Sequence, residues 1–207
     1  MKSIISFVKS KIAKTNLGKK LQEKYGSQSR LINSGASKID GIKLNLACGN
    51  LHILGYVNID SSDYCAPDLV STTQDITKHF EYETISNITI IHGLGYLSSD
   101  EAIAFFRDAF NLLVSGCELI IETPSLNKIA KQIVAAESDL TVEPELIFPI
   151  FATSNSGPTH GECYQFAWTQ TLLGAELLQA GFKSVRAEAP LTHGQKSDRD
   201  MRIIATK

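Results

Sequence analysis

The stretch KLNLACGNLHILGYVNID, residues 43–60, decides how this chain folds. It holds two apolar runs of strand length around a turn of small residues, and the second run ends in an aspartate. The two runs are either strands of an open sheet with a ligand site after the first, or a buried hairpin. A parallel crossover usually takes a dozen or more residues, and only nine lie between Leu46 and Tyr56. The spacing therefore predicts a first helix reduced to about one turn, or two strands that are not neighbours.

Strand and helix patterns alternate along the rest of the chain. Strand-length apolar runs cover Ile42–Leu46, Tyr56–Ile59, Asp68–Val70, Ile88–Ile91, Glu118–Glu122, Lys183–Glu188 and Met201–Thr206. Helical patterns cover Asp100–Val114, Leu126–Ala136 and Gln170–Ala180. Ser98 and Glu101 form a capping-box signature, Thr169 can cap the last helix, and Gly116 and Gly181 follow helix ends. This alternation predicts an α/β fold with a doubly wound, mostly parallel sheet and helices on both faces.

The N-terminal part of the chain differs in charge from the rest. Residues 1–30 hold eight Lys or Arg and one acidic residue, whereas the remainder carries a net charge of −9. Residues 1–25 predict a basic amphipathic helix, which we expect to lie on an anionic membrane surface, on the acidic body or on a second subunit. Residues 26–41, rich in Gly and Ser, predict a linker. The acidic body argues against a nucleic-acid partner.

Composition restricts the class of protein. The chain of 207 residues is 43% hydrophobic and 20% charged, which is ordinary for a soluble protein. It has no signal-peptide pattern and no apolar run near the roughly 18 residues of a membrane span. Its four cysteines show no metal-ligand spacing, so we expect reduced thiols and no metal site. We expect a cytoplasmic protein, with peripheral contact to the inner face of the membrane as a further option.

Polar and small residues follow each predicted strand. In doubly wound sheets ligands bind at the carboxyl ends of the strands, and these positions are Ala47-Cys48-Gly49-Asn50, Asp60, Asp75, His92-Gly93 and Glu122-Thr123-Pro124. Glycine allows close approach of the backbone to a ligand, and a carboxylate after the second strand can accept two ribose hydroxyls. Taken singly, each aspartate is better explained as a turn or cap residue. Their order along the chain favours a nucleoside site.

Six segments together resemble the successive motifs of class I S-adenosylmethionine-dependent methyltransferases, and most closely the type 11-like branch. They are LNLACGN, GYVNID, PDLVSTTQDITKHF, IIHGLGYLS, NLLVSGCELIIETPSL and PTHGECYQFAWTQTLLGAELLQAGF. The resemblance covers about residues 42–207, with a substrate-side insertion at about 137–160. It implies a Rossmann-like domain that binds S-adenosylmethionine and methylates a hydroxyl or amine of a small molecule or glycan. Because members of this branch often accompany enzymes of surface polysaccharide synthesis, a glycan is one implied substrate.

The resemblance also implies a role for each matching position. Ala47, Cys48, Gly49 and Asn50 would line the amino-acid part of the cofactor, Asp60 would bind the ribose, and Asp75 with Ile76 would meet the adenine. His92 and Gly93 would lie beside the methyl donor, and His160 would face the acceptor. Transfer to a hydroxyl needs a base, for which His92 and His160 are the candidates and His193 the third.

The chain departs from the family pattern at Ala47, Asn45, Gly95-Tyr96 and Val114-Ser115-Gly116-Cys117, and two of these departures bear most on activity. Ala47 stands where the family has glycine, and Gly95-Tyr96 stands where it has Glu-His. These departures leave a second hypothesis open, in which the chain is a methyltransferase-like binding or scaffold protein without catalysis. A third hypothesis, a nucleotide-dependent oxidoreductase, is weaker because the three-glycine fingerprint after the first strand is missing.

Overall fold

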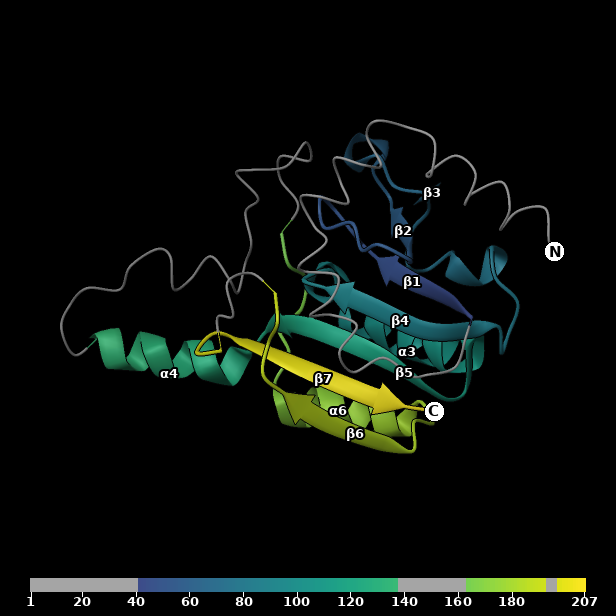
Figure 1. Ribbon diagram of the computed structural model, residues 1–207. Helices are drawn as coiled ribbons and strands as arrows, with labels where there is room; N and C mark the ends of the chain where they lie inside the picture. The colour runs from purple at the N-terminus through teal and green to yellow at the C-terminus, as the bar shows by residue number, and fades with distance from the viewer. Residues whose placement is uncertain (1–40, 138–162, 193–196) are drawn as a thin grey trace.

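The computed structural model of the protein describes residues 41–137, 163–192 and 197–207, which form a seven-stranded sheet. The strand order is β3-β2-β1-β4-β5-β7-β6 (Figure 1). β7 runs antiparallel to β5 and β6, and all other neighbours are parallel. The strands are β1 Ile42–Leu46, β2 Val57–Asp60, β3 Leu69–Val70, β4 Ile85–Ile91, β5 Leu113–Pro124, β6 Ser184–Glu188 and β7 Asp200–Thr206.

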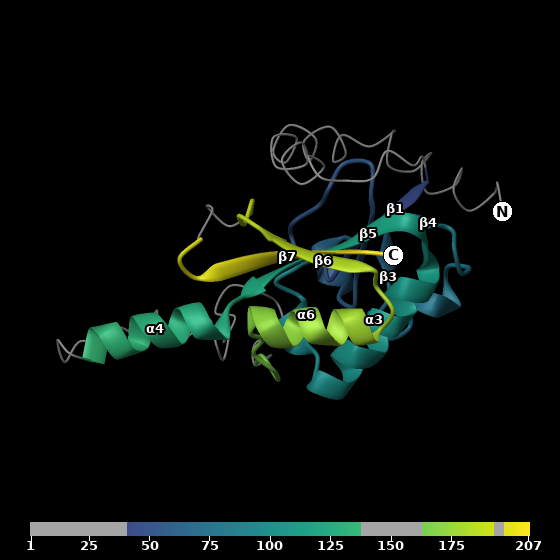
Figure 2. The same cartoon turned by 90° about the horizontal axis from the view of Figure 1, so that it is seen from below.

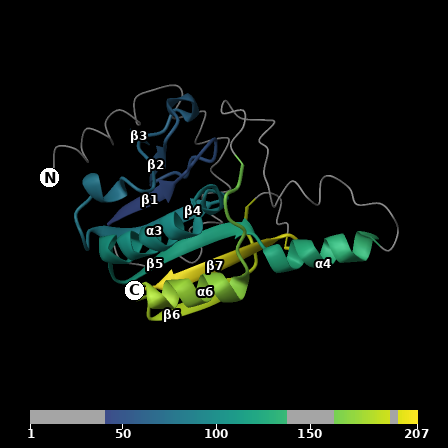
Figure 3. The same cartoon turned by 180° about the vertical axis from the view of Figure 1, so that it is seen from behind.

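The described α-helices lie on one side of this sheet, as Figure 2 shows. They are α3 Ser99–Leu112, α4 Leu126–Glu137 and α6 Gln170–Gln179, and three short 3₁₀ turns are η2 Asp63–Cys65, η3 Ile76–Lys78 and η4 Leu94–Tyr96. α3 and α6 lie side by side and bury one core with the apolar face of the sheet, whereas α4 extends outward from the end of β5 (Figure 3). Within the described residues, the connections from β1 to β4 contain only loops and 3₁₀ turns. For that reason no described α-helix covers the opposite face.

Local sequence signals set most of the helix boundaries. The capping box is confirmed, because the Ser98 hydroxyl accepts from the backbone N–H of Glu101 and the Glu101 carboxylate accepts from the N–H of Ser98. The Thr169 hydroxyl caps α6 by accepting from Leu172 N–H. The predicted C-terminal end of the helix at Asp100–Val114, just before Gly116, is wrong. α3 ends at Leu112 because the next residues are already paired with β4 as the start of β5.

The connection between β1 and β2 is a loop held by two buried asparagines. The strands are parallel neighbours, with Asn45 opposite Asn58, so the hairpin interpretation is excluded. Asn45 Nδ2 donates to Asn58 Oδ1 (2.9 Å) and to the carbonyl of Leu51 (2.6 Å). Asn58 Oδ1 also accepts from Ile53 N–H (2.8 Å), and Asn58 Nδ2 donates to Asp68 (3.0 Å). These side chains satisfy backbone groups that a crossover helix would otherwise pair internally.

Several sequence predictions fall on residues outside the described ranges. They are the basic helix at 1–25, the linker at 26–41 apart from its last residue, and the insertion at about 137–160 apart from its first. Among the described helices, none is both long enough and apolar enough to cross a bilayer.

Replacing Asn58 with Ala tests whether the asparagine pair holds the crossover. The substitution removes the acceptor of Ile53 N–H, one bond from Asn45 Nδ2 and one bond to Asp68, so we expect the free energy of unfolding to fall by about 3 kcal/mol. Urea unfolding measures the change. The matched control is Asn127→Ala on the exposed side of α4, for which we expect a change within about 0.5 kcal/mol. Equal effects of the two substitutions would contradict the assigned role.

Candidate functional site

The turn after β1 adopts a left-handed backbone at two positions. Ala47 has φ +48° and Gly49 has φ +47°. The position where glycine was expected therefore does need a positive φ, which costs alanine about 1 kcal/mol. The turn is held by hydrogen bonds from Cys48 N–H to the carbonyl of Ile59 (3.0 Å) and from Leu51 N–H to the carbonyl of Cys48 (2.8 Å). A Cβ built on Gly49 meets no atom within 4 Å, so the turn faces open space.

Asp60 links this turn to the end of β2. Its Oδ2 accepts from the backbone N–H of Gly49 (2.8 Å), and its Oδ1 accepts from the N–H of Ser62 (2.9 Å). Both bonds fix the carboxylate at the carboxyl edge of the sheet. Each oxygen keeps a second lone pair, so the partly exposed carboxylate can still accept from a ligand.

The turn after β4 packs directly on the turn after β1. A Cβ on Gly93 would lie 2.5 Å from the Cβ of Ala47, so no larger residue fits at this contact. His92, just before it, also has a positive φ of +57°. A non-glycine residue in this region is uncommon and is often associated with a functional site. The structure thus brings Ala47, Gly49, Asp60, His92 and Gly93 together at one edge.

The other residues predicted to bind the cofactor differ in solvent exposure. Asn50 is exposed, whereas Cys48 is 4% exposed, and burial together with the nearby Asp60 raises the pKa of its thiol. Asp75 precedes η3 and forms an ion pair with Lys78 (2.7 Å). Ile76 is fully buried in the core, with neither its side chain nor its backbone exposed.

His92 lies against a buried carboxylate from the start of β7. Its Nε2 is 3.2 Å from Oδ2 of Asp200, which is 1% exposed. Arg199 holds the same carboxylate from its other side, with Nε to Oδ1 and Nη2 to Oδ2 both at 2.6 Å. Burial alone would raise the pKa of Asp200, but the hydrogen bonds from His92 and Arg199 outweigh it and lower the pKa to about 2. Asp200 is therefore ionised at neutral pH.

A second buried charge pair anchors the segment before β7. Arg202 donates to Glu122 Oε1 (2.6 Å), and both side chains are at most 1% exposed. Glu122 also accepts from the backbone N–H groups of Leu191 (2.9 Å) and Thr192 (3.1 Å) and from the Thr192 hydroxyl. These bonds hold the end of the β6 connection at the carboxyl end of β5. The backbone carbonyl of Glu122 in turn accepts from His92 N–H (2.7 Å).

Aromatic residues of the segment before α6 cover the turn after β4. A Cβ on Gly95 would lie 2.9 Å from the Tyr164 ring, so the absence of a side chain at Gly95 is what lets Tyr164 lie there. The Tyr164 hydroxyl donates to the carbonyl of His92 (3.3 Å), and its ring makes an edge contact with Tyr96 at 4.7 Å. Trp168, in contrast, is 1% exposed and belongs to the core.

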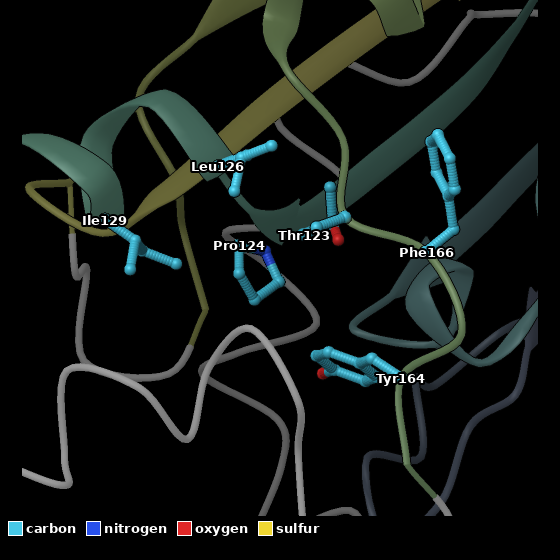
Figure 4. A pocket seen from close by; sticks show the side chains of 7 residues that line it. Thr123, Pro124, Leu126, Ile129, Tyr164 and Phe166 are labelled. Atoms are coloured by element: carbon cyan, nitrogen blue, oxygen red, sulfur yellow. The ribbon is translucent and has the colours of Figure 1, made fainter.

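A shallow apolar pocket lies beside this aromatic segment. It is formed by the end of β5, the first turn of α4 and the segment before α6, and Figure 4 shows its side chains. Its lining residues are Thr123, Pro124, Leu126, Ile129, Tyr164, Phe166 and Ala167. Through Tyr164 the pocket adjoins His92, which makes it a candidate place for an acceptor.

The edge contains residues that the sequence analysis did not single out, and two of the histidines that it named cannot be placed. His160 and His193 lie outside the described residues. Asp200 and Arg199 were not singled out, because only residues after each strand were considered. β7 runs antiparallel, so its first residue and the residue before it meet the edge formed by the carboxyl ends of its parallel neighbours.

Comparisons with known proteins give structural but not sequence matches. No family model matches the chain, and no curated protein matches it. An S-adenosylmethionine-dependent methyltransferase from Archaeoglobus fulgidus aligns with a TM-score of 0.60 at 12% identity, over 90% of this chain and 97% of that one. One from Methanosarcina mazei gives 0.60 at 16% identity, over 85% and 96%. One from Thermotoga maritima gives 0.58 at 12% identity, over 88% and 89%.

The chain has the class I methyltransferase fold. The alignment spans nearly the full length of these methyltransferases, so the similarity extends over the whole sheet and not only its first half. At such identities the likeness shows the fold alone, and it does not separate the type 11-like branch from other class I methyltransferases.

Replacing Ala47 with Gly tests the left-handed turn. Glycine removes the backbone strain at φ +48° and so stabilises the folded state. This gain offsets the stability lost through the missing methyl group and through the greater freedom of the unfolded chain. The matched control is Ala104→Gly on the exposed side of α3, which we expect to lower the free energy of unfolding by about 1 kcal/mol. We expect Ala47→Gly to be more stable than the control by about 1 kcal/mol in urea unfolding. An Ala47→Gly protein less stable than the control would contradict the assigned strain.

The low pKa of Asp200 predicts how stability depends on pH. Since this pKa lies at about 2 instead of the usual 3.8, the carboxylate stabilises the folded state above about pH 4 and loses this contribution as pH falls toward 2. The unfolding free energies of the wild type and Asp200→Asn should therefore differ by about 2 kcal/mol less at pH 2.5 than at pH 6. Urea unfolding at both values measures this, with Asp63→Asn as the exposed control. A difference that is the same at both pH values would refute the assignment.

Proposed function

We propose that the protein is an S-adenosylmethionine-dependent methyltransferase. The observation that carries this proposal is the bond from Gly49 N–H to Asp60, which joins the left-handed turn after β1 to the carboxylate after β2. In the class I methyltransferase fold this places an open turn and a hydroxyl-binding carboxylate side by side at the ligand-binding edge. The aligned structures from Archaeoglobus fulgidus and Methanosarcina mazei are named as proteins that use the same cofactor.

The residues at this edge fit the cofactor. The space over Gly49 leaves room for its amino-acid part near Ala47 and Asn50. Asp60 has lone pairs for the ribose hydroxyls, and Asp75, farther along the chain, has a carboxylate that can accept from the adenine amino group. His92 and Gly93 lie next to Ala47, where the methyl donor is expected.

When bound, S-adenosylmethionine supplies a methyl group on a positively charged sulfur. The protein's own contribution is to place an acceptor in line with that methyl group and to exclude water. For a hydroxyl acceptor, His92 takes the proton as a general base. His92 is partly exposed at the edge, and its position is fixed by contacts on its backbone and its ring. His160, whose surroundings are not described, remains a second candidate for this role.

The acceptor that we propose is a hydroxyl or amine of a small molecule or a glycan, including a substrate in surface polysaccharide synthesis. Tyr164 lies against the backbone of His92 and contacts the Tyr96 ring, and flat aromatic surfaces suit the C–H faces of a sugar. The apolar pocket beside Tyr164 suits a non-polar part of the same acceptor. Labelled methyl transfer into a cell extract would also decide between this enzyme and the alternative, a binding protein without catalysis.

Calorimetric titration with S-adenosylhomocysteine, the demethylated product, tests cofactor binding. We expect the wild type to bind it and Asp60→Asn to bind at least 10-fold more weakly, because an amide offers one acceptor where the carboxylate offers two. Asp63→Asn, an exposed acid three residues later, is the matched control and should bind as the wild type does. Folded wild-type protein that gives no heat with the product would refute the proposal.

A further inference from the structure

The face of the sheet that turns away from α3 and α6 is buried at its centre. Ile120 of β5 and Ile204 of β7 are register partners, and both are fully buried. Neither belongs to the core that α3 and α6 cover, whereas Ile121, the next residue of β5, does. Because side chains alternate along a strand, Ile120 and Ile204 point to the opposite face. Among the described residues, no α-helix lies over this face (Figure 2).

The described loops on this face contact the sheet on either side of the isoleucine pair. On one side the hydroxyl of Tyr56, just before β2, donates to Asn87 of β4 (3.0 Å), which lies opposite Glu118. On the other side the segment between β6 and β7 reaches Glu122 through Thr192. A side chain in the middle of a sheet face stays exposed unless a second layer packs on it. Burial of the isoleucine pair therefore requires a layer beyond these contacts.

The same face carries buried polar atoms around the isoleucine pair. Oδ1 of Asn45, Oε2 of Glu118 and Nη2 of Arg202 find no hydrogen-bond partner among the described residues. All three side chains are buried, at 1%, 8% and 0% exposure. Two of these atoms are acceptors and the third is a donor, and a buried polar atom without a partner is unfavourable. The missing layer must therefore bring polar groups together with apolar ones.

The sequence of residues 2–25 has the character of such a layer. Ile4, Val8 and Ile12 recur at a spacing of four, which on a helix forms one apolar stripe. Lysines occupy many of the other positions, and residues 1–30 hold eight Lys or Arg against one acidic residue. A lysine can lay its apolar stem on the sheet and donate from its ammonium group to a buried acceptor. The charge of this segment also complements the acidic remainder of the chain.

Position along the chain favours this segment over the other parts outside the described ranges. The segment precedes β1, which lies inside the sheet. Residues 26–41 can extend up to about 50 Å, more than the width of about 30 Å that seven strands span. Residues 138–162 instead follow α4, which extends outward, and they hold four acidic residues and no Lys or Arg. Residues 193–196 are too few to form a layer.

We propose that residues 2–25 pack as an amphipathic helix across this face of the sheet, with the apolar stripe on Ile120 and Ile204 and lysines at the rim. The partner of this face is thus the chain's own N-terminal segment, and not a membrane surface or a second copy of the chain. The segment takes the place of the crossover helices that the short connections between β1 and β4 leave out. The inference does not depend on the proposed function.

Methyl NMR of the full chain tests this packing. Ile120→Val and Ile204→Val assign the δ1-methyl signals of the two side chains. In the wild type we expect nuclear Overhauser contacts from both methyl groups to residues 2–25, including the ring of Phe7. Contacts to residues 138–162 instead, or none to residues 2–25, would overturn the inference, and this result needs no variant to fold. Contacts that a mixture of labelled and unlabelled chains shows to run between two copies would overturn it too.

Val8→Asp interrupts the apolar stripe, and Ser10→Asp, which adds the same charge off the stripe, is the matched control. We expect Val8→Asp to shift the signals of Ile120 and Ile204 but not that of Ile121, and to lower the urea midpoint by about 1 M. The control should do neither, and equal effects of the two substitutions would contradict the packing. Vesicles of phosphatidylglycerol should leave the wild-type contacts in place. Loss of these contacts when vesicles bind would make the membrane the partner of the segment and overturn the inference.

Discussion

The hydrogen bond between Asn45 and Asn58 is the interaction on which the rest of the site depends. It joins β1 to β2 across a connection too short for a crossover helix, and it organises the loop between them through Leu51 and Ile53. Because the two strands end in register, the turn after β1 comes to lie against the carboxylate after β2. Together with the pairing of β1 and β2, the asparagine pair places Asp60 beside Gly49.

Buried ion pairs lie at the same edge of the sheet, on the side of β5 and β7. Glu122 with Arg202 and Asp200 with Arg199 occupy neighbouring positions on β5 and β7, and His92 contacts both acidic residues. A buried ion pair is costly to form and strongly destabilising to break, so it contributes more to specific placement than to net stability. Here the pairs fix the segment before β7 and the orientation of one histidine, which is the accuracy that a reacting group needs.

Much of the fold could be predicted from the sequence, because strand length, alternation and caps are local signals. The capping box at Ser98 and the α6 cap at Thr169 are examples. The early end of α3 at Leu112 could not be predicted, since it depends on pairing of β5 with β4. The sequence suggested that alanine at position 47 would be strained by a positive φ, and the structure has φ +48° there. Gly95 makes room for the Tyr164 ring, which only the tertiary structure reveals.

The residues predicted after β1, β2 and β4 lie together where the strands run parallel, whereas the prediction omits the residues at the end of the sheet where β7 reverses. Residues after β1, β2 and β4 were found because they follow their strands along the chain. Asp200 is the first residue of its strand, and its partner His92 lies more than a hundred residues earlier, so no local pattern links them. Because β7 runs antiparallel, its first residues and not its last lie at the edge of the proposed site. Only the fold establishes this direction.

A crystal structure with S-adenosylhomocysteine bound tests the central claim most directly, namely that the edge formed by β1, β2 and β4 is the cofactor site. The account predicts that the ribose hydroxyls contact Asp60, that the amino-acid part lies over Gly49, and that the sulfur lies on the side of His92 and Gly93. A product bound elsewhere on the sheet, or with its ribose away from Asp60, would contradict it.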